Sequence, residues 1–187
     1  EMTSSLVGSE MCIRDRSQKT KCDKEVIADY CIYAFNNYAV SALEDYGITG
    51  ITYPLELNEK ELSEMDIDNG ELVVYGRIPL MITANCIDKT SGNCHKGSTL
   101  FSMLRDRKNA LLPVLTCCKF CYNIIYNSVP VYLFDKLDRI RIRPEYYGII
   151  FTTENAAEVA DIFKCFNNRT KPEDNTFTRG HFTRGVE

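Results

Sequence analysis

Between residues 26 and 83, apolar segments alternate with segments of helical character. Three of the apolar segments are rich in β-branched, aromatic and aliphatic residues and predict strands: 26–36, 48–57 and 71–83. Between these, Asn37 is placed to cap a helix that stops at Gly47, and Asn58 and Glu61 have the spacing of a capping box. This alternation predicts parallel βα units whose strands are covered on both faces, as in an α/β barrel or a doubly wound sheet.

After Thr83 the pattern changes. Residues 100–117 predict a β-hairpin that turns around Lys108 and Asn109. A βα pattern then returns, because 146–152 has the composition of a strand and Thr153 and Glu154 are placed to open a helix. The apolar face expected for this helix contains Ala156, Val159, Ala160 and Phe163.

Composition excludes several classes of protein. The chain has 187 residues, 44% of them hydrophobic and 26% charged, which is typical of a globular domain. No apolar run approaches the length of a membrane span, so no transmembrane helix is predicted. Nine cysteines are unevenly spaced in a chain of this size, which favours reduced thiols and a cytoplasmic location over a secreted disulfide scaffold.

The first sixteen residues differ from the rest of the chain. The string SSLVGSEMCIRDR resembles the conceptual translation of sequencing-adapter DNA. We therefore expect 1–16 to be non-native sequence and exclude it from functional inference, together with Cys12. The remainder is expected to be the C-terminal part of a longer protein.

Several separate segments resemble the collagenase-like peptidase family called U-thirty-two. They are ELVVYGRIPLM at 71–81, Cys86, FCYNIIYNS at 120–128 and FTRGHFTRGVE at 177–187, with FNNYAV and YPLELN upstream. The resemblance implies an α/β fold, the C-terminal remnant of a TIM-like α/β barrel with a cysteine-bearing β-hairpin insertion. The expected parts are the last βα units (17–84), the cysteine module (85–123), a returning βα segment (124–166), and a linker with a C-terminal tail (167–187).

The resemblance implies two kinds of activity. Some family members are linked to collagen degradation, so the chain is expected to belong to a peptidase of unknown catalytic type. Others resemble proteins of oxygen-independent hydroxylation that act on transfer RNA, ribosomal RNA or a quinone precursor and carry an iron–sulfur cluster on four cysteines. A peptide or a structured RNA is therefore the expected substrate.

The cysteines are the candidate metal ligands. When the family signature is aligned on Glu71 and Gly76, its first cysteine falls on Pro79, so one expected ligand is absent, and its second falls on Cys86. Four thiols remain in the pattern C-x7-C-x23-C-x2-C: Cys86, Cys94, Cys118 and Cys121. Four thiolates fit a four-iron four-sulfur cluster, and zinc is the alternative, although the wide first half is unlike a zinc ribbon.

The alternative interpretation of the cysteines is structural. Cysteine is among the residues most often buried, so Cys117 and Cys118 also fit a core position after a strand. Cys22, Cys31 and Cys165 lie in apolar periodic segments, and we interpret them as core residues.

Candidate catalytic residues are few. The chain has neither HExxH nor GxSxG and only two histidines, His95 and His181. Glu56 ends one predicted strand and Glu71 occupies the glutamate position of the signature, so these two carboxylates are the candidates for acid–base chemistry. Both also fit solvated positions at strand boundaries.

Local charge supports the RNA alternative. Residues 86–123 contain six Lys or Arg and two Asp, a local charge of 6 − 2 = +4 in a chain of net charge −4. Such a patch beside Phe120 and Tyr122 predicts contacts with phosphates and bases, although an ordinary lysine-rich face has the same composition. In the tail, Arg179, His181 and Arg184 are candidate substrate-binding residues or parts of a flexible terminus.

Overall fold

The computed structural model describes residues 25–94, 99–172 and 176–185, and the chain divides into two compact units with mixed α/β structure. The first unit comprises Glu1–Val74, Asp135–Ile149 and Arg179–Glu187, and the second comprises Tyr75–Phe134 and Ile150–Thr178. The expectations for 1–16, Cys22, His95 and Lys96 concern positions outside the described residues.

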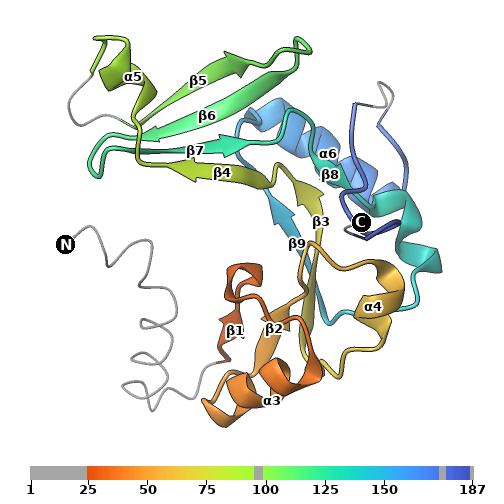
Figure 1. Cartoon of the computed structure of the whole chain (residues 1–187). Coiled ribbons are helices and arrows are strands. Elements are labelled where there is room, and N and C mark those ends of the chain that lie inside the picture. The colour runs from red at the N-terminus through yellow and green to blue at the C-terminus, as the bar shows by residue number, and fades with distance from the viewer. Residues whose placement is uncertain (1–24, 95–98, 173–175, 186–187) are drawn as a thin grey trace. The chain divides into compact units, whose positions relative to one another are not determined.

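The first unit contains the predicted parallel βα units. Strands β1 (Ile27–Ala28), β2 (Gly50–Thr52) and β3 (Gly70–Gly76) pair in parallel and in that order (Figure 1). Helix α3 (Asn37–Asp45) connects β1 to β2, and α4 (Glu59–Ser63) connects β2 to β3. The prediction of alternating strands and helices with parallel pairing is therefore confirmed for this segment. The strand predicted at 146–152 is present as β9 (Tyr146–Ile150), which also pairs with β3.

The prediction of one strand over 26–36 is wrong. Within this segment only Ile27–Ala28 form a strand, and a 3₁₀ turn follows at Tyr30–Ile32 because the Asp29 carboxylate accepts a hydrogen bond from the Cys31 N–H at 3.0 Å. Tyr33 then adopts a left-handed conformation with φ of 58°, which ends any extended run. Cys31 is consequently exposed and is not the core residue we expected.

Helix termini in this unit follow their local signals closely. The side chain of Asn36, one residue before the predicted cap, accepts from the Ala39 N–H at 2.9 Å and starts α3. Gly47 has φ of +82° after the end of α3, as a glycine stop predicts. The capping box of α4 is confirmed, because Asn58 accepts from backbone N–H groups while Glu61 accepts from the Asn58 N–H at 2.8 Å.

The predicted strand 71–83 is two strands in different sheets. Gly76, the last residue of β3, has φ of +153°, and a Cβ there would lie 2.8 Å from the Ile150 Cβ, so only glycine fits this break. Strand β4 (Pro79–Thr83) then enters a four-stranded antiparallel sheet of order β4-β7-β6-β5 (Figure 1).

The other strands of this sheet are β5 (Thr99–Arg105), β6 (Leu111–Cys117) and β7 (Tyr122–Tyr126). The hairpin predicted around Lys108 and Asn109 is confirmed, since β5 and β6 pair from Thr99↔Cys117 to Arg105↔Leu111. A short helix, α5 (Ile87–Thr90), lies in the connection from β4 to β5.

The second unit also contains β8 (Val131–Tyr132), which pairs antiparallel with the end of β3, and helix α6 (Ala156–Asn168). Phe134 is fully buried, with ring centroids 4.5 Å from Tyr132, 5.2 Å from Phe166 and 5.9 Å from Tyr75. This aromatic cluster packs α6 against the end of β3 and β8. In the first unit, a separate apolar cluster contains Ala28, Ala34, Val40, Ile48 and Ile51.

Helix α6 differs from its prediction in start and in orientation. Asn155, not Thr153 or Glu154, caps the helix, and its Oδ1 accepts from the N–H groups of Ala157 and Glu158. The half-buried face consists of Val159, Ile162, Cys165 and Phe166, whereas Ala156, Ala160 and Phe163 are exposed. Within the described part of the chain, no helix is long and apolar enough to cross a membrane.

Candidate functional site

The register of the four-stranded sheet brings the cysteine-bearing loops to one end of it. Strand β4 ends at Thr83, which pairs with Asn123 at the start of β7, and β5 starts at Thr99, which pairs with Cys117 at the end of β6. The connection from β4 to β5, with Cys86 and Cys94, therefore leaves and re-enters the sheet at the end where the β6–β7 turn carries Cys118 and Cys121. Figure 1 shows α5 and the β6–β7 turn at this end, which we call the cysteine end.

The individual cysteines differ in exposure. Cys86 precedes α5 and is 7% exposed, whereas Cys94 and Cys121 are exposed and Cys117 and Cys118 are half-buried. None of the seven cysteines that the structure describes forms a disulfide. Cys117 and Cys118 are thus not the fully buried core residues of the structural alternative.

The β6–β7 turn is held in a tight conformation. The Phe120 N–H donates to the Cys117 carbonyl at 3.1 Å, and Cys121 has φ of 54°, in the left-handed region that non-glycine residues rarely occupy. Such a conformation costs on the order of 1 kcal/mol. The strain therefore falls on one of the four predicted ligands.

A hydrogen bond from a buried side chain joins the start of β7 to the loop that carries Cys86. Asn123 is completely buried, and its Nδ2 donates to the carbonyl oxygen of Asn85 at 2.9 Å. Asn85 immediately precedes Cys86, and Asn123 follows Cys121 by two residues. Sequence reasoning missed Asn123, although an amide inside the apolar strand YNIIY was a visible signal.

The donor set of the cysteine end fits the metal centres that the resemblance implies. Four thiols on two loops match the ligands of an iron–sulfur cluster or of zinc, both of which prefer thiolate. Among the described residues, no three Cys, His, Asp or Glu side chains are gathered closely enough to hold a metal ion. The assignment of Cys86, Cys94, Cys118 and Cys121 as ligands stays a prediction.

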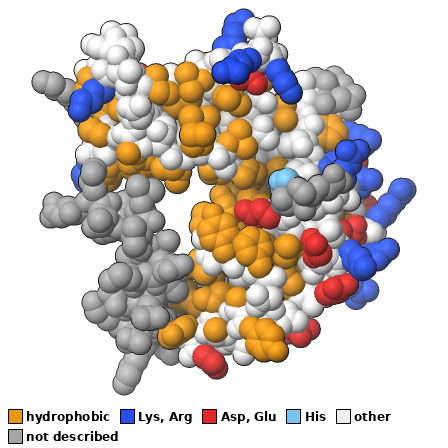
Figure 2. Space-filling view, viewed as in Figure 1, with side chains coloured by type: hydrophobic (Ala, Val, Ile, Leu, Met, Phe, Trp, Pro, Cys, Tyr) orange, Lys and Arg blue, Asp and Glu red, His pale blue; other side chains and the backbone are white. Residues whose placement is uncertain are grey.

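The basic residues of the cysteine module do not form one patch. Arg105, Arg107 and Lys108 lie at the β5–β6 turn, at the opposite end of the sheet from the cysteines, whereas Lys89 and Lys119 lie at the cysteine end. Hydrophobic side chains gather over the sheet between them, including the exposed Leu80, Ile82, Phe101 and Met103 (Figure 2). The sequence count of charges thus combined two separate groups.

A second candidate site, which the sequence did not indicate, is a cavity of about 690 Å³ within the second unit. It is lined by aromatic, charged and small polar residues: Tyr75, Arg77, Pro130, Tyr132, Thr153, Glu154, Glu158, Asp161, Ile162, Lys164, Cys165, Pro172, Thr176 and Phe177. The signal that was available is Arg77, a charged residue inside the apolar run VVYGRIPLM.

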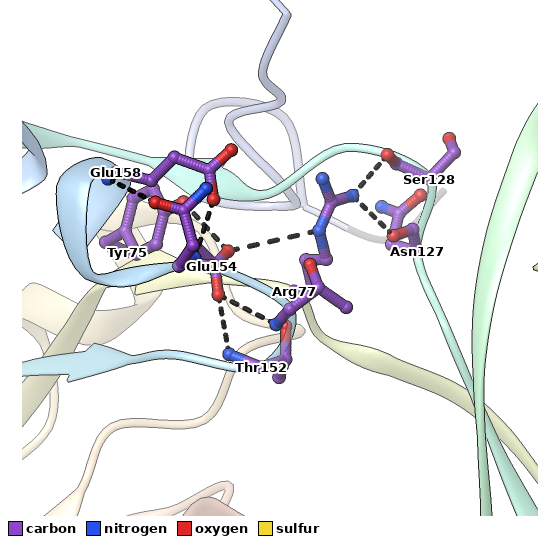
Figure 3. Close-up of polar contacts among 9 residues, drawn as sticks. Tyr75, Arg77, Asn127, Ser128, Thr152, Glu154 and Glu158 are labelled. Carbon is purple, nitrogen blue, oxygen red and sulfur yellow. Dashed lines mark hydrogen bonds and ion pairs between the residues drawn. The ribbon is translucent and has the colours of Figure 1, made fainter. Parts of the chain in front are cut away.

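Glu154 is the centre of the polar network in this cavity (Figure 3). Its side chain is 7% exposed and accepts hydrogen bonds from the Thr152 N–H at 2.6 Å, the Thr153 N–H at 3.0 Å and the Tyr75 hydroxyl at 3.0 Å. Burial alone raises the pKa of this carboxyl, but the hydrogen bonds outweigh burial and hold the pKa below its usual value. Burial, and then the negative charge of Glu154, raise the pKa of Tyr75. The pair is therefore a carboxylate and a neutral phenol at neutral pH.

Arg77 connects this network to the loop before β8. Its Nη1 donates to the carbonyl oxygens of Ser128 and, at 3.1 Å, of Asn127, and its Nε lies 4.0 Å from Glu154 Oε1 (Figure 3). The guanidinium therefore anchors the Asn127–Ser128 backbone through Nη1, while its buried Nε donor has no hydrogen-bond partner among the described residues.

The two predicted catalytic carboxylates lie in the first unit. Glu71 is the second residue of β3 and accepts a hydrogen bond from the Thr52 hydroxyl at 2.7 Å, while Glu56 lies in the loop after β2. Glu56 Oε2 is buried without a hydrogen-bond partner among the described residues, which is unusual for a carboxylate. Among the described contacts, no hydrogen bond joins the two side chains, so their catalytic role stays a prediction.

The predicted substrate-binding residues of the tail also lie in the first unit. Arg179 forms a bidentate ion pair with Asp135, with distances of 2.5 and 2.8 Å. His181 Nδ1 lies 3.0 Å from the Gly185 carbonyl oxygen, and Arg184 is exposed. The guanidinium of Arg179 thus has a structural partner, and a role in substrate binding stays a prediction for all three.

Comparisons of the chain with models of protein families, with curated proteins and with solved structures find no match.

Proposed function

We propose that this chain belongs to a protein of the collagenase-like peptidase family U-thirty-two and holds a four-iron four-sulfur cluster on Cys86, Cys94, Cys118 and Cys121. The nominal activity is proteolysis, with a peptide as substrate. In this proposal the parallel βα segment is the remnant of a TIM-like barrel, and the protein works in the cytoplasm, where thiols remain reduced.

One observation supports the proposal most directly. The residue pairs Thr83↔Asn123 and Thr99↔Cys117 place two cysteine-bearing loops at the same end of one sheet, although their cysteines are up to 35 positions apart in the chain. Cysteines that only fill a core are not expected to cluster at one end of a sheet. Cys94 and Cys121 are also exposed, unlike residues of a core.

When bound, a cluster of this kind supplies a one-electron redox centre. The chain contributes the thiolates and two loops of different character. Cys86 is shielded from solvent and Cys121 is exposed, so the two loops would offer such a group one buried thiol and one solvent-accessible thiol.

The test is anaerobic purification of the full chain, followed by iron, sulfide and zinc analysis and a visible spectrum. We expect about four iron and four sulfide per chain and a broad visible absorption. Cys86→Ser and Cys118→Ser are expected to lose both iron and colour. Cys165→Ser is the matched control, because Cys165 is a half-buried cysteine of α6 outside the ligand set, and it is expected to retain the cluster.

Other outcomes have definite meanings. Colourless protein with one zinc per chain supports instead a zinc-stabilised RNA-binding module without enzymatic activity. Metal-free protein that stays folded refutes the metal centre altogether. Proteolysis is tested with collagen-derived peptides, and cleavage that Glu71→Gln or Glu56→Gln abolishes supports the peptidase assignment.

A second candidate function is oxygen-independent hydroxylation of transfer RNA, ribosomal RNA or a quinone precursor. It is favoured by a cation and two stacked aromatic rings at the cysteine end. Lys119 Nζ lies 5.2 Å from the Phe120 ring centroid, and the Phe120 and Tyr122 rings are stacked at 6.4 Å. Such a group binds the π-face of a base or of a quinone ring. Loss of RNA or quinone binding in Phe120→Ala, with retention of the cluster, supports this function.

A further inference from the structure

We propose that Asn123 is a positioning residue for the cysteine end, which holds the loop bearing Cys86 against the strand that follows Cys121. The inference rests on the proposed metal centre for its functional meaning. It also makes a prediction about the loop itself that holds whether or not a cluster is present.

The geometry around Asn123 confines the start of the loop from both sides. Thr83, the last residue of β4, pairs with Asn123, and the Thr83 hydroxyl accepts a hydrogen bond from the Asn85 N–H at 3.1 Å. The Asn85 carbonyl in turn accepts the 2.9 Å hydrogen bond from Asn123 Nδ2. Both polar groups of the Asn85 backbone are thus occupied, and Cys86 follows directly.

The same loop is closed on the far side of Cys86. The Cys86 carbonyl accepts hydrogen bonds from the Thr90 N–H at 3.0 Å and from the Thr90 hydroxyl at 2.9 Å. Cys86 therefore lies between two anchored peptide groups, and it is 7% exposed. The bond from Asn123 is the anchor that reaches it from the other cysteine-bearing segment.

An amide at this position lowers stability unless its hydrogen bond to the loop compensates for burying it. Asn123 is completely buried, and its Oδ1 has no hydrogen-bond partner among the described residues, so the side chain leaves a buried acceptor unsatisfied. Leucine has the same side-chain branching, although its methyl groups are larger than the amide atoms, and it leaves no acceptor unsatisfied. What leucine lacks is the donor to Asn85, and this donor is the property that explains the residue.

A single hydrogen bond thus couples the two halves of the ligand set. Cys118 and Cys121 precede Asn123 in the same turn and strand, and Cys86 follows its acceptor. Loops that are held together before a metal arrives lose less conformational freedom on binding it. The bond accordingly acts through Cys86 and does not itself contact the metal.

The experiment compares Asn123→Leu with Thr116→Val in the full chain. Thr116 pairs with Asn123 across β6 and β7, is equally buried, and its hydroxyl has no hydrogen-bond partner among the described residues. Thr116→Val therefore removes a buried polar group at the same site without removing a bond to the loop. Alkylation of each cysteine in reduced, metal-free protein is followed by mass spectrometry.

In Asn123→Leu we expect Cys86 to be alkylated about three- to tenfold faster than in the wild type, the factor that corresponds to the net worth of one hydrogen bond. The rates of the exposed Cys121 and of Cys165 are expected to stay unchanged, as are all rates in Thr116→Val. A merely structural role would instead accelerate every protected cysteine together. In cluster-loaded protein, Asn123→Leu is expected to lose iron to a chelator several-fold faster than Thr116→Val.

The outcomes separate this inference from the proposed metal centre. If the wild type binds no iron but Asn123→Leu still exposes Cys86, the positioning role stands and the cluster is refuted. If the wild type holds a cluster and Asn123→Leu matches it in Cys86 alkylation and iron retention, the positioning role is refuted and the cluster stands. Should Asn123→Leu fail to fold, Asn123→Ser, whose side chain is too short to reach Asn85, supplies the same comparison.

Discussion

Replacement of Glu154 by glutamine tests the electrostatics of the second unit, because glutamine keeps the shape of the side chain and removes its charge. In the native cavity, one carboxylate oxygen accepts from the Thr152 and Thr153 N–H groups and the other accepts from the Tyr75 hydroxyl. The amide that Glu154→Gln introduces has a single acceptor oxygen, so it can accept hydrogen bonds on only one side of this network.

The expected cost follows from these bonds. A hydrogen bond to a charged group contributes about 1.5–3 kcal/mol to stability, against about 0.5–1.5 kcal/mol for a neutral one. If glutamine keeps the two backbone bonds in weaker form and loses the bond from Tyr75, Glu154→Gln lowers the free energy of unfolding by about 3–6 kcal/mol. The longer 4.0 Å contact with Arg77 adds little to this sum.

The pH dependence has a definite sign. The pKa of Glu154 is lowered in the folded protein, so the carboxylate contributes stability that is fully present above the usual pKa of 4.5 and is lost as pH falls through the folded pKa. Protonated Glu154 resembles glutamine in charge. The stability difference between wild type and Glu154→Gln is therefore expected to be constant near neutral pH and to shrink below pH 4.5.

The assay is urea unfolding followed by circular dichroism at pH 7 and at a series of lower pH values. The matched control is Asp161→Asn in the same cavity wall, because Asp161 and its partner Lys164 are both about 70% exposed and their ion pair is screened by solvent. A deficit of Glu154→Gln that persists unchanged at low pH, or that does not exceed that of Asp161→Asn at pH 7, refutes the reasoning.

Two further predictions concern stability. Asn58→Ala removes the cap of α4, whose Oδ1 accepts from the Lys60 and Glu61 N–H groups, and is expected to lower the unfolding free energy by about 1 kcal/mol in urea titration, whereas Asn58→Asp retains the cap. Phe134→Ala opens the aromatic cluster of the second unit and is expected to cost about 3–5 kcal/mol, which would appear as a large fall in the thermal midpoint; a loss below about 1 kcal/mol would contradict the packing described for Phe134.

Local signals in the sequence predicted local structure well. The capping box at Asn58 and Glu61, the glycine stop at Gly47 and the hairpin around Asn109 all depend on interactions between residues close in sequence, and the structure confirms each of them. The parallel order of β1, β2 and β3 also followed from the alternation of strands and helices. These features need no knowledge of distant contacts.

The misassignments arise where a local preference competes with another local bond or with packing. The run 26–36 has strand composition, but the Asp29 side chain caps a turn at Cys31 and interrupts it. The run 71–83 is continuous in hydrophobicity, yet Gly76 breaks it and β4 joins a different sheet. Hydrophobicity alone does not indicate where one strand ends and another begins.

The Glu154 cavity was invisible to sequence reasoning for a different reason. Tyr75 and Glu154 are 79 positions apart in the chain, and no sequence spacing links Glu154 to the segment that contains Tyr75 and Arg77. Only the packing of α6 on the end of β3 brings them together. Arg77 in an apolar run indicated a charged group close to the core, but its partner Glu154 is identified only by the tertiary structure.

The cysteine end shows how a long gap in sequence can be a short distance in the fold. The 23 residues between Cys94 and Cys118 contain β5, its turn and β6, and these two strands pair along their whole length from Thr99↔Cys117 to Arg105↔Leu111. A hairpin of this kind leaves the cysteine end and returns to it, so its length adds nothing to the separation of the loops that flank it. Removal of one residue from each strand of the hairpin keeps the pairing at the cysteine end. Removal of one residue from β6 alone shifts the register by one residue and turns the side chains that follow the deletion, including Cys117, to the other face. The 23-residue gap in C-x7-C-x23-C-x2-C therefore reflects the length of the paired strands β5 and β6. A site on these cysteines requires that these strands pair in register, and it does not require a gap of this particular length.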